Sequence, residues 1–95
     1  MALFLALIND LDEIKKQPEG TVDRAQKFCE VAKKMGITVK EILWVQGKYD
    51  GIALLEAPDP EIVSALMLCM KNYRSQTFRV YDEDDMKQIL ARMEV

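Results

Sequence analysis

The side chains with the greatest capacity for chemistry lie in a glycine-flanked segment near the middle of the chain. Tyr49 and Asp50 are adjacent there, and a carboxylate beside a phenol could serve as a base with an acid or hydrogen-bond donor. The structural alternative is that the aspartate stabilises a turn while the tyrosine packs against a hairpin. Both interpretations fit the residues, and the structural one is simpler.

Two further sets of polar and aromatic residues lie on the strands that flank or follow this segment. If both sets point away from the helices, they line the rim of one sheet face, where arginine and aromatic rings suit a small apolar or anionic ligand. The same residue types are enriched at protein interfaces, so an assembly contact is the alternative. The complete candidate pocket consists of Trp44, Gln46, Tyr49, Asp50, Thr77, Arg79 and Tyr81.

Other chemistries are poorly supported by the residues. Glu56 and Asp59 could form an acid–base pair, but a strand end followed by a helix cap explains them more simply. The chain has no histidine, which excludes Ser-His-Asp and Cys-His catalysis and most zinc and haem sites. Cys29 and Cys69 form no Cys-x-x-Cys pair, so reduced thiols are expected rather than a disulfide. We expect no metal and no cofactor.

Length and charge restrict the class of protein. Ninety-five residues with a net charge of −3 predict a single domain over residues 1–95. The scattered basic residues disfavour binding to nucleic acid or to an anionic membrane. The longest apolar run, residues 1–8, is too short to span a bilayer and lacks the features of a secretory signal. A cytoplasmic protein is therefore expected.

The elements that would position these residues follow from hydrophobic periodicity and from turn residues. Apolar residues recur at helical spacing after Thr21, which is a suitable N-cap, and Gly36 suits the position beyond that helix. Asp59 followed by proline marks a second helix, and Asp82 can cap a third. The expected strands cover residues 2–8, 39–46, 52–57 and 75–81, and the expected helices cover residues 21–35, 60–72 and a segment after Asp82.

This order predicts an α+β fold, a ferredoxin-like βαββαβ sandwich with a C-terminal helix. Its four-stranded antiparallel sheet has the strand order 4-1-3-2. The first and third strands are continuous apolar runs, as expected of central strands buried on both faces. Two helices cover one face, and the last helix can cover only part of the other. A second copy of the chain is the simplest remaining cover, so we expect a homodimer or higher homo-oligomer.

Several residues together resemble the GYD domain family, which is named for its Gly-x-Tyr-Asp turn. The resemblance rests on Gly47-x-Tyr49-Asp50, on Glu56-Ala57-Pro58-Asp59, on Gly36, and on Arg74, Thr77, Arg79, Asp82 and Glu83 in their order. It implies a ferredoxin-like fold of the dimeric α/β-barrel group, and it implies no settled activity. The sequence departs from the family pattern at residues 70–73, where no glycine-containing turn is present.

Three functions remain open at this stage. The first is a non-catalytic or regulatory protein that binds a small molecule and self-associates. The second is a small metal-free enzyme, monooxygenase- or isomerase-like, that acts on an apolar or aromatic substrate near Trp44, Arg79 and Tyr81. The third is a structural assembly subunit. The residues assign no reaction, because fold-level analogy does not choose among them.

Overall fold

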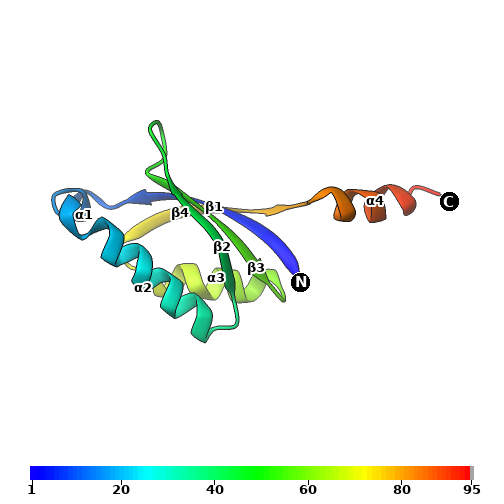
Figure 1. The fold of residues 1–95 in the computed structure, drawn as a ribbon, viewed down its shortest axis with the longest axis horizontal. Coiled ribbons are helices and arrows are strands. Elements are labelled where there is room, and N and C mark those ends of the chain that lie inside the picture. Colours follow the sequence, from blue (N-terminus) through cyan, green and yellow to red (C-terminus); the bar gives the residue numbers. More distant parts are fainter. Residues whose placement is uncertain (95) are drawn as a thin grey trace.

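The computed structural model describes residues 1–94, which form one antiparallel sheet with helices on one side and a helical arm at the C-terminus (Figure 1). The strands are β1 (Ala2–Asp10), β2 (Thr38–Trp44), β3 (Gly51–Ala57) and β4 (Tyr73–Val80). The helices are α1 (Asp12–Lys15), α2 (Thr21–Lys34), α3 (Pro60–Cys69) and α4 (Glu83–Ala91), and a 3-10 turn, η1 (Pro18–Gly20), precedes α2.

The sheet order is β2-β3-β1-β4, which confirms the predicted order read from the opposite edge. All three strand pairs are antiparallel, and the two apolar strands β1 and β3 are the central ones. Leu5 lies opposite Leu54 of β3 and opposite Phe78 of β4. The predicted α+β, ferredoxin-like arrangement is therefore correct.

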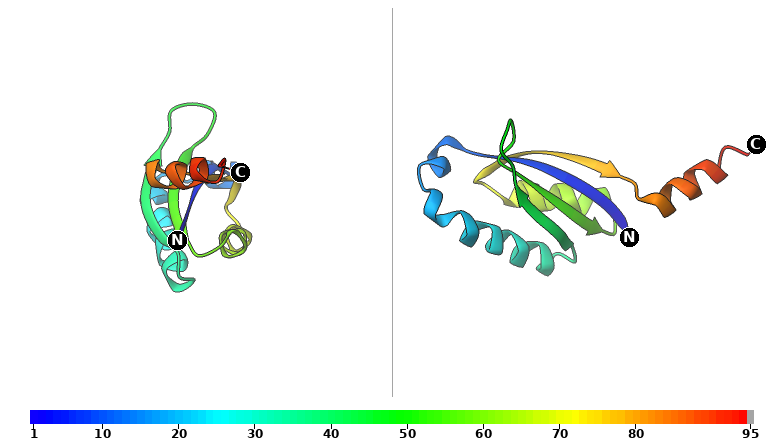
Figure 2. Two further views of the ribbon diagram at one scale, coloured as in Figure 1. Left: turned by 90° about the vertical axis from the view of Figure 1, so that its right-hand side faces the viewer. Right: turned by 45° about the horizontal axis from the view of Figure 1, so that its top comes forward.

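The two faces of this sheet have different surroundings. On the inner face, alternate residues of β1 and β3 are buried beneath α2 and α3 (Figure 2). The core comprises Phe4, Ala6, Phe28, Ala32, Ile37, Ala53, Leu55, Ala57, Val63 and Leu66. The outer face carries the opposite parity, and none of its apolar residues is buried. These outer-face residues are Leu3, Leu5, Leu7, Leu43, Ile52, Leu54, Phe78 and Val80.

Local signals explain where the helices begin and end. The Asp59 carboxylate accepts a hydrogen bond from the backbone N–H of Ile62 at 2.8 Å, so the predicted cap of α3 is confirmed. Asp82 and Asp85 form a reciprocal capping box at the start of α4. Gly36 follows α2 with a φ of 82°, a left-handed conformation that glycine adopts without steric cost.

Several details differ from the sequence-based prediction. Thr21 is itself helical and its hydroxyl donates to the Pro18 carbonyl, so it does not cap α2; the preceding 3-10 turn leads directly into the helix. Helix α3 ends at Cys69 rather than near residue 72, because Met70 adopts an extended conformation. The chain then enters β4 at Tyr73, and no glycine is required in that connection.

Helix α4 extends away from the body of the molecule, in line with the end of β4 (Figures 1 and 2). It contributes no buried residue. The radius of gyration is 14.9 Å, whereas a compact chain of this length has a value of about 12 Å. The projecting helix α4 accounts for this larger radius of gyration.

Candidate functional site

A cleft opens at the end of the sheet where β1 terminates and α2 begins. Its floor is apolar, and its rim holds two carboxylates, a phenol and an indole. The lining residues are Ile8, Asp10, Thr21, Ala25, Phe28, Ile42, Leu43, Trp44, Asp50, Gly51, Ile52 and Tyr73. The water-accessible volume is about 50 Å³, and one water needs roughly 10–15 Å³ by this measure. The cleft therefore admits the head of a small ligand rather than a whole drug-sized molecule.

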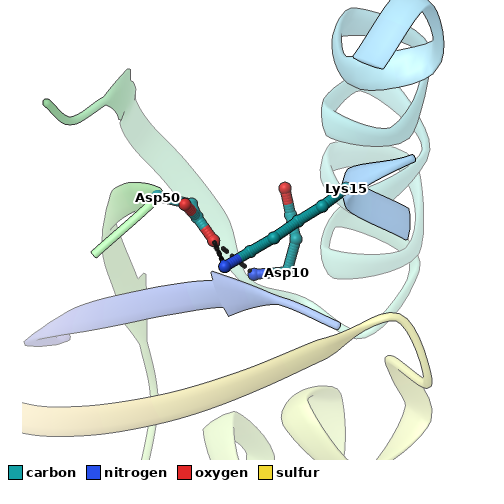
Figure 3. A network of polar contacts seen from close by, with 3 residues as sticks. All are labelled: Asp10, Lys15 and Asp50. Carbon is teal, nitrogen blue, oxygen red and sulfur yellow. Dashed lines mark hydrogen bonds and ion pairs between the residues drawn. The ribbon is translucent and has the colours of Figure 1, made fainter. Parts of the chain in front are cut away.

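Asp50 reaches the cleft from the loop between β2 and β3. Its carboxylate accepts a hydrogen bond from the backbone N–H of Asp10 at 2.8 Å and lies 3.7 Å from the Lys15 ammonium (Figure 3). Its own backbone N–H donates to the Ile8 carbonyl, and its carbonyl accepts from the N–H of Val45. Asp50 therefore fixes the hairpin onto the end of β1, which supports the structural interpretation of this residue.

The Asp10 carboxylate has a different environment. Burial raises its pKa above the ordinary value, and the nearby charge of Asp50 acts in the same direction, while Arg24 and Lys15 oppose the shift. Among residues 1–94, this carboxylate accepts no hydrogen bond and forms no ion pair. Asp10 is therefore an acceptor that the protein itself leaves unused.

Tyr73 lies directly opposite Asp10, where β1 pairs with β4. Burial raises the pKa of its phenol, the charge of Asp10 raises it further, and Arg24 lowers it. The Arg24 guanidinium is held nearby by its bonds to the Gln17 carbonyl and to the Thr21 hydroxyl. The phenol therefore remains protonated at neutral pH and can donate a hydrogen bond beside Asp10.

Trp44 supplies the aromatic wall of the cleft. It is the last residue of β2, pairs with Gly51, and remains 55% exposed. The strand ends there, so the predicted alternation does not continue to Gln46, which is exposed in the following loop. Of the predicted pocket residues, the structure brings only Trp44 and Asp50 together in this cleft.

Tyr49 lies next to Asp50 in the chain but makes its contact elsewhere. Its hydroxyl donates to the Gln76 side chain of β4 at 2.9 Å. Gln76 pairs with Leu7, which belongs to the outer face. The two adjacent residues of the Gly-x-Tyr-Asp turn thus bond to different strands, Asp50 to β1 and Tyr49 to β4.

The remaining predicted residues lie on β4 and just beyond it. Thr77 and Arg79 pair with Ala6 and Phe4, so they share the inner face with the core rather than the outer face. The Arg79 guanidinium donates to the Leu3 and Val80 carbonyls and lies 4.6 Å from the centre of the Tyr81 ring. Arg79 and Tyr81 are therefore separate from the Trp44 cleft, and this guanidinium is already bonded.

The sequence interpretation did not select Asp10 or Tyr73. Asp10 is the last residue of β1 and lies two positions beyond the predicted end of that strand, so an acid at a strand end was the available signal. No local sequence pattern connects Asp10 to Tyr73, because the pairing of β1 with β4 joins positions that are far apart in the chain. The alternative acid pair does not form: Glu56 lies 3.7 Å from the Lys40 ammonium, and Asp59 caps α3.

Two negative observations apply to residues 1–94. No cluster of three or more cysteine, aspartate or glutamate side chains has the arrangement of a metal site there. None of the helices in that range has the length and apolarity needed to cross a bilayer.

Comparison with known proteins supports the fold. The sequence model of the family described as GYD domain matches residues 4–90. The crystal structure of the protein TTHA0845 from Thermus thermophilus superposes with a TM-score of 0.52 and 25% sequence identity. That match covers 87% of this chain and 100% of the other. No curated protein matches the chain significantly.

Proposed function

This chain belongs to the GYD domain family, and we propose that it binds a small molecule in the cleft between the end of β1 and the start of α2. The single observation that carries the proposal is the unused acceptor Asp10, which lies in that cleft among apolar and aromatic residues. A cleft of this composition, with few polar groups on an apolar floor, is typical of ligand sites.

The charge of the cleft defines the class of ligand. Asp10 offers a carboxylate that accepts no hydrogen bond within residues 1–94, whereas Asp50 is already bonded to the Asp10 N–H and paired with Lys15. An ammonium or another hydrogen-bond donor at Asp10 is therefore favoured over an anion. The exposed Trp44 ring suits a planar apolar group or a cation at its face. The ligand expected from the sequence was apolar or anionic, and its anionic character depended on Arg79, which bonds to backbone carbonyls instead.

Titration calorimetry with tryptamine and indole-3-acetate tests this proposal, because the two compounds share a ring and carry opposite charges. We expect saturable binding of tryptamine and none of indole-3-acetate. Asp10→Asn should weaken tryptamine binding by about tenfold, the usual worth of a charge-assisted hydrogen bond. Asp12→Asn, an exposed acid of α1 outside the cleft, is the matched control and should change nothing. Equal binding of both compounds, or of neither, would overturn the proposal.

A second candidate function is a metal-free enzyme that uses this same cleft. The observation that favours it is the pair of Asp10 and Tyr73, whose pKa values are both raised by burial. A carboxyl group with a raised pKa can act as a general acid or base, and the neighbouring phenol can donate a proton or a hydrogen bond. An NMR spectrum of tryptamine that stays unchanged during long incubation with equimolar protein would favour binding without reaction.

We also propose that the chain self-associates through the outer face, in the cytoplasm, where its thiols would stay reduced. The apolar outer face supports this, since central strands with two apolar faces are normally covered on both. Sedimentation velocity over a range of concentrations tests it. A monomer at all concentrations up to about 100 μM, well above the dissociation constants of stable complexes, would contradict the proposal. A stable oligomer without any tryptamine binding would favour a structural assembly role.

A further inference from the structure

A second cavity lies on the helical side of the sheet, between α2 and the connection that leads from α3 to β4. It is an open groove with a water-accessible volume of about 260 Å³, whereas the cleft described above has about 50 Å³. Arg24, Lys27 and Val31 line the groove from α2, and residues 69–73 line it from the other side. Tyr73 lines both cavities, so the groove and the cleft are neighbours.

The charged side chains of the groove are all basic. They are Arg24, Lys27 and Lys71, here called the groove cations, and within residues 1–94 no acidic side chain lines the groove. This is a local reversal of charge, because the whole chain carries a net charge of −3. The ion pairs of residues 1–94 involve none of the groove cations, although Asp23 precedes Lys27 by one helical turn. Like charges around one hollow attract an anion to it.

Both walls of the groove are held by bonds that leave its cations available. The Arg24 guanidinium uses two of its five N–H donors, on a carbonyl and a hydroxyl of the chain just before it. On the other wall, the Asn72 carbonyl accepts a hydrogen bond from the backbone N–H of Leu11 at 3.0 Å. Val31 and Met70 pack against the core and contribute apolar surface to the groove. The groove therefore combines fixed walls, unused positive charge and an apolar surface.

We propose that this groove binds a phosphate monoester, with the phosphate among the groove cations and the organic group against Val31 and Met70. A phosphate monoester carries a charge of about −1.5 to −2 at pH 7 and offers three acceptor oxygens, which suits three cations on two walls. A monocarboxylate brings one charge, and a single exposed ion pair contributes little. The groove therefore favours phosphates over carboxylates such as indole-3-acetate. The proposal does not depend on ligand binding at Asp10.

A titration of the ¹⁵N-labelled full chain with phenyl phosphate, followed by amide NMR spectra, tests the site. Benzoate is the matched compound, because it carries the same ring and only one negative charge. We expect saturable shifts at the amides of Lys27, Lys71 and Asn72 and no shift of the Trp44 indole N–H, which reports on the cleft. Benzoate should bind at least about tenfold more weakly. Shifts centred on Trp44, equal affinity for the two compounds, or no saturation with either would overturn the proposal.

Three variants at constant ionic strength test the groove cations. Lys27→Gln and Lys71→Gln should each weaken phenyl phosphate binding by about threefold, and the double variant by about tenfold, as expected for exposed charge pairs. Lys34→Gln is the matched control, because it removes the same charge from α2 outside the groove and should leave binding unchanged. All three side chains are exposed, so the variants should keep the parent melting temperature. An equal loss in Lys34→Gln would indicate general attraction to surface charge and would overturn the site.

Discussion

The Asp50 carboxylate accepts a hydrogen bond from the backbone N–H of Asp10 at 2.8 Å, and this bond joins the β2–β3 hairpin to the end of the central strand β1. The two residues are forty positions apart in sequence. The contact also brings two carboxylates to one cleft, so a structural bond and a candidate ligand site share the same residues.

We expect Asp50→Ala to lower the free energy of unfolding by about 1 kcal/mol, because it leaves a partly buried N–H without its acceptor. The ion pair with Lys15 adds little, since both side chains are substantially exposed. Asp50→Asn keeps an acceptor oxygen and should lose less. Urea denaturation of the three proteins measures the difference, and an Asp50→Ala protein as stable as the parent would contradict the role assigned to this bond.

Ionisation of the Asp10 carboxyl group should lower the free energy of unfolding as the pH rises. Its folded-state pKa is raised above 3.8, its ordinary value, so between these two values the folded state binds more protons than the unfolded state. The contribution of this group to stability is therefore fully present below pH 3.8 and is lost as the pH rises through the folded-state pKa.

Asp10→Asn removes this titration, so we expect the variant to be more stable than the parent at pH 7 and to lose that advantage on acidification below pH 3.8. Urea denaturation of both proteins at several pH values measures this, and a difference that does not vary with pH would contradict it. A carboxylate that lowers stability is expected where function requires it.

Tyr49→Phe should lower the free energy of unfolding by about 0.5 kcal/mol, the lower range for a single hydrogen bond, because its bond to Gln76 is exposed. Tyr81→Phe is the matched control, since the Tyr81 hydroxyl makes no hydrogen bond within residues 1–94 and its ring stacking is retained. Thermal denaturation at fixed pH compares the two variants, and equal melting temperatures would show that the Tyr49 bond contributes nothing.

Leu66 and Leu68 provide a direct test of the core. Leu66 is 0% exposed on α3, whereas Leu68 on the same helix is 84% exposed. Leu66→Ala should cost about 3 kcal/mol through lost burial and a residual cavity, and Leu68→Ala should change stability by less than about 0.5 kcal/mol. Similar losses for both would mean that α3 does not pack on the sheet as described.

The features predicted from sequence were those that a single segment determines. The apolar residues of β1 and β3 on both parities identified the central strands, and Asp59 before a proline identified the start of α3. The family resemblance was also confirmed. These signals depend on local periodicity and capping, which need no knowledge of the partner strands.

The candidate site was harder to predict because strand register and orientation determine it. Tyr73 lies beside Asp10 only through the pairing of β1 with β4. The predicted strand began at residue 75, whereas β4 begins at Tyr73, so the prediction left Tyr73 outside the sheet. The faces of Thr77 and Arg79 follow from the same register, since a shift of one residue would exchange them with Phe78. Trp44 lies on the cleft side of the sheet because the pairing of β2 with β3 shifts between Val39 and Glu41, which exchanges the faces of the residues that follow.

The position of β1 in the middle of the sheet has a consequence for how the chain folds. Strand β1 precedes both of its neighbours in the sequence, β3 and β4, so its second neighbour is available only after synthesis has passed Val80. Pairings between distant segments carry a large loop-closure entropy and slow the folding of a small domain. Until then, one edge of an apolar strand stays open, and open apolar edges promote aggregation. We expect productive folding of this protein to begin with the β1–β3 pair and to depend on protection of β1 until β4 arrives.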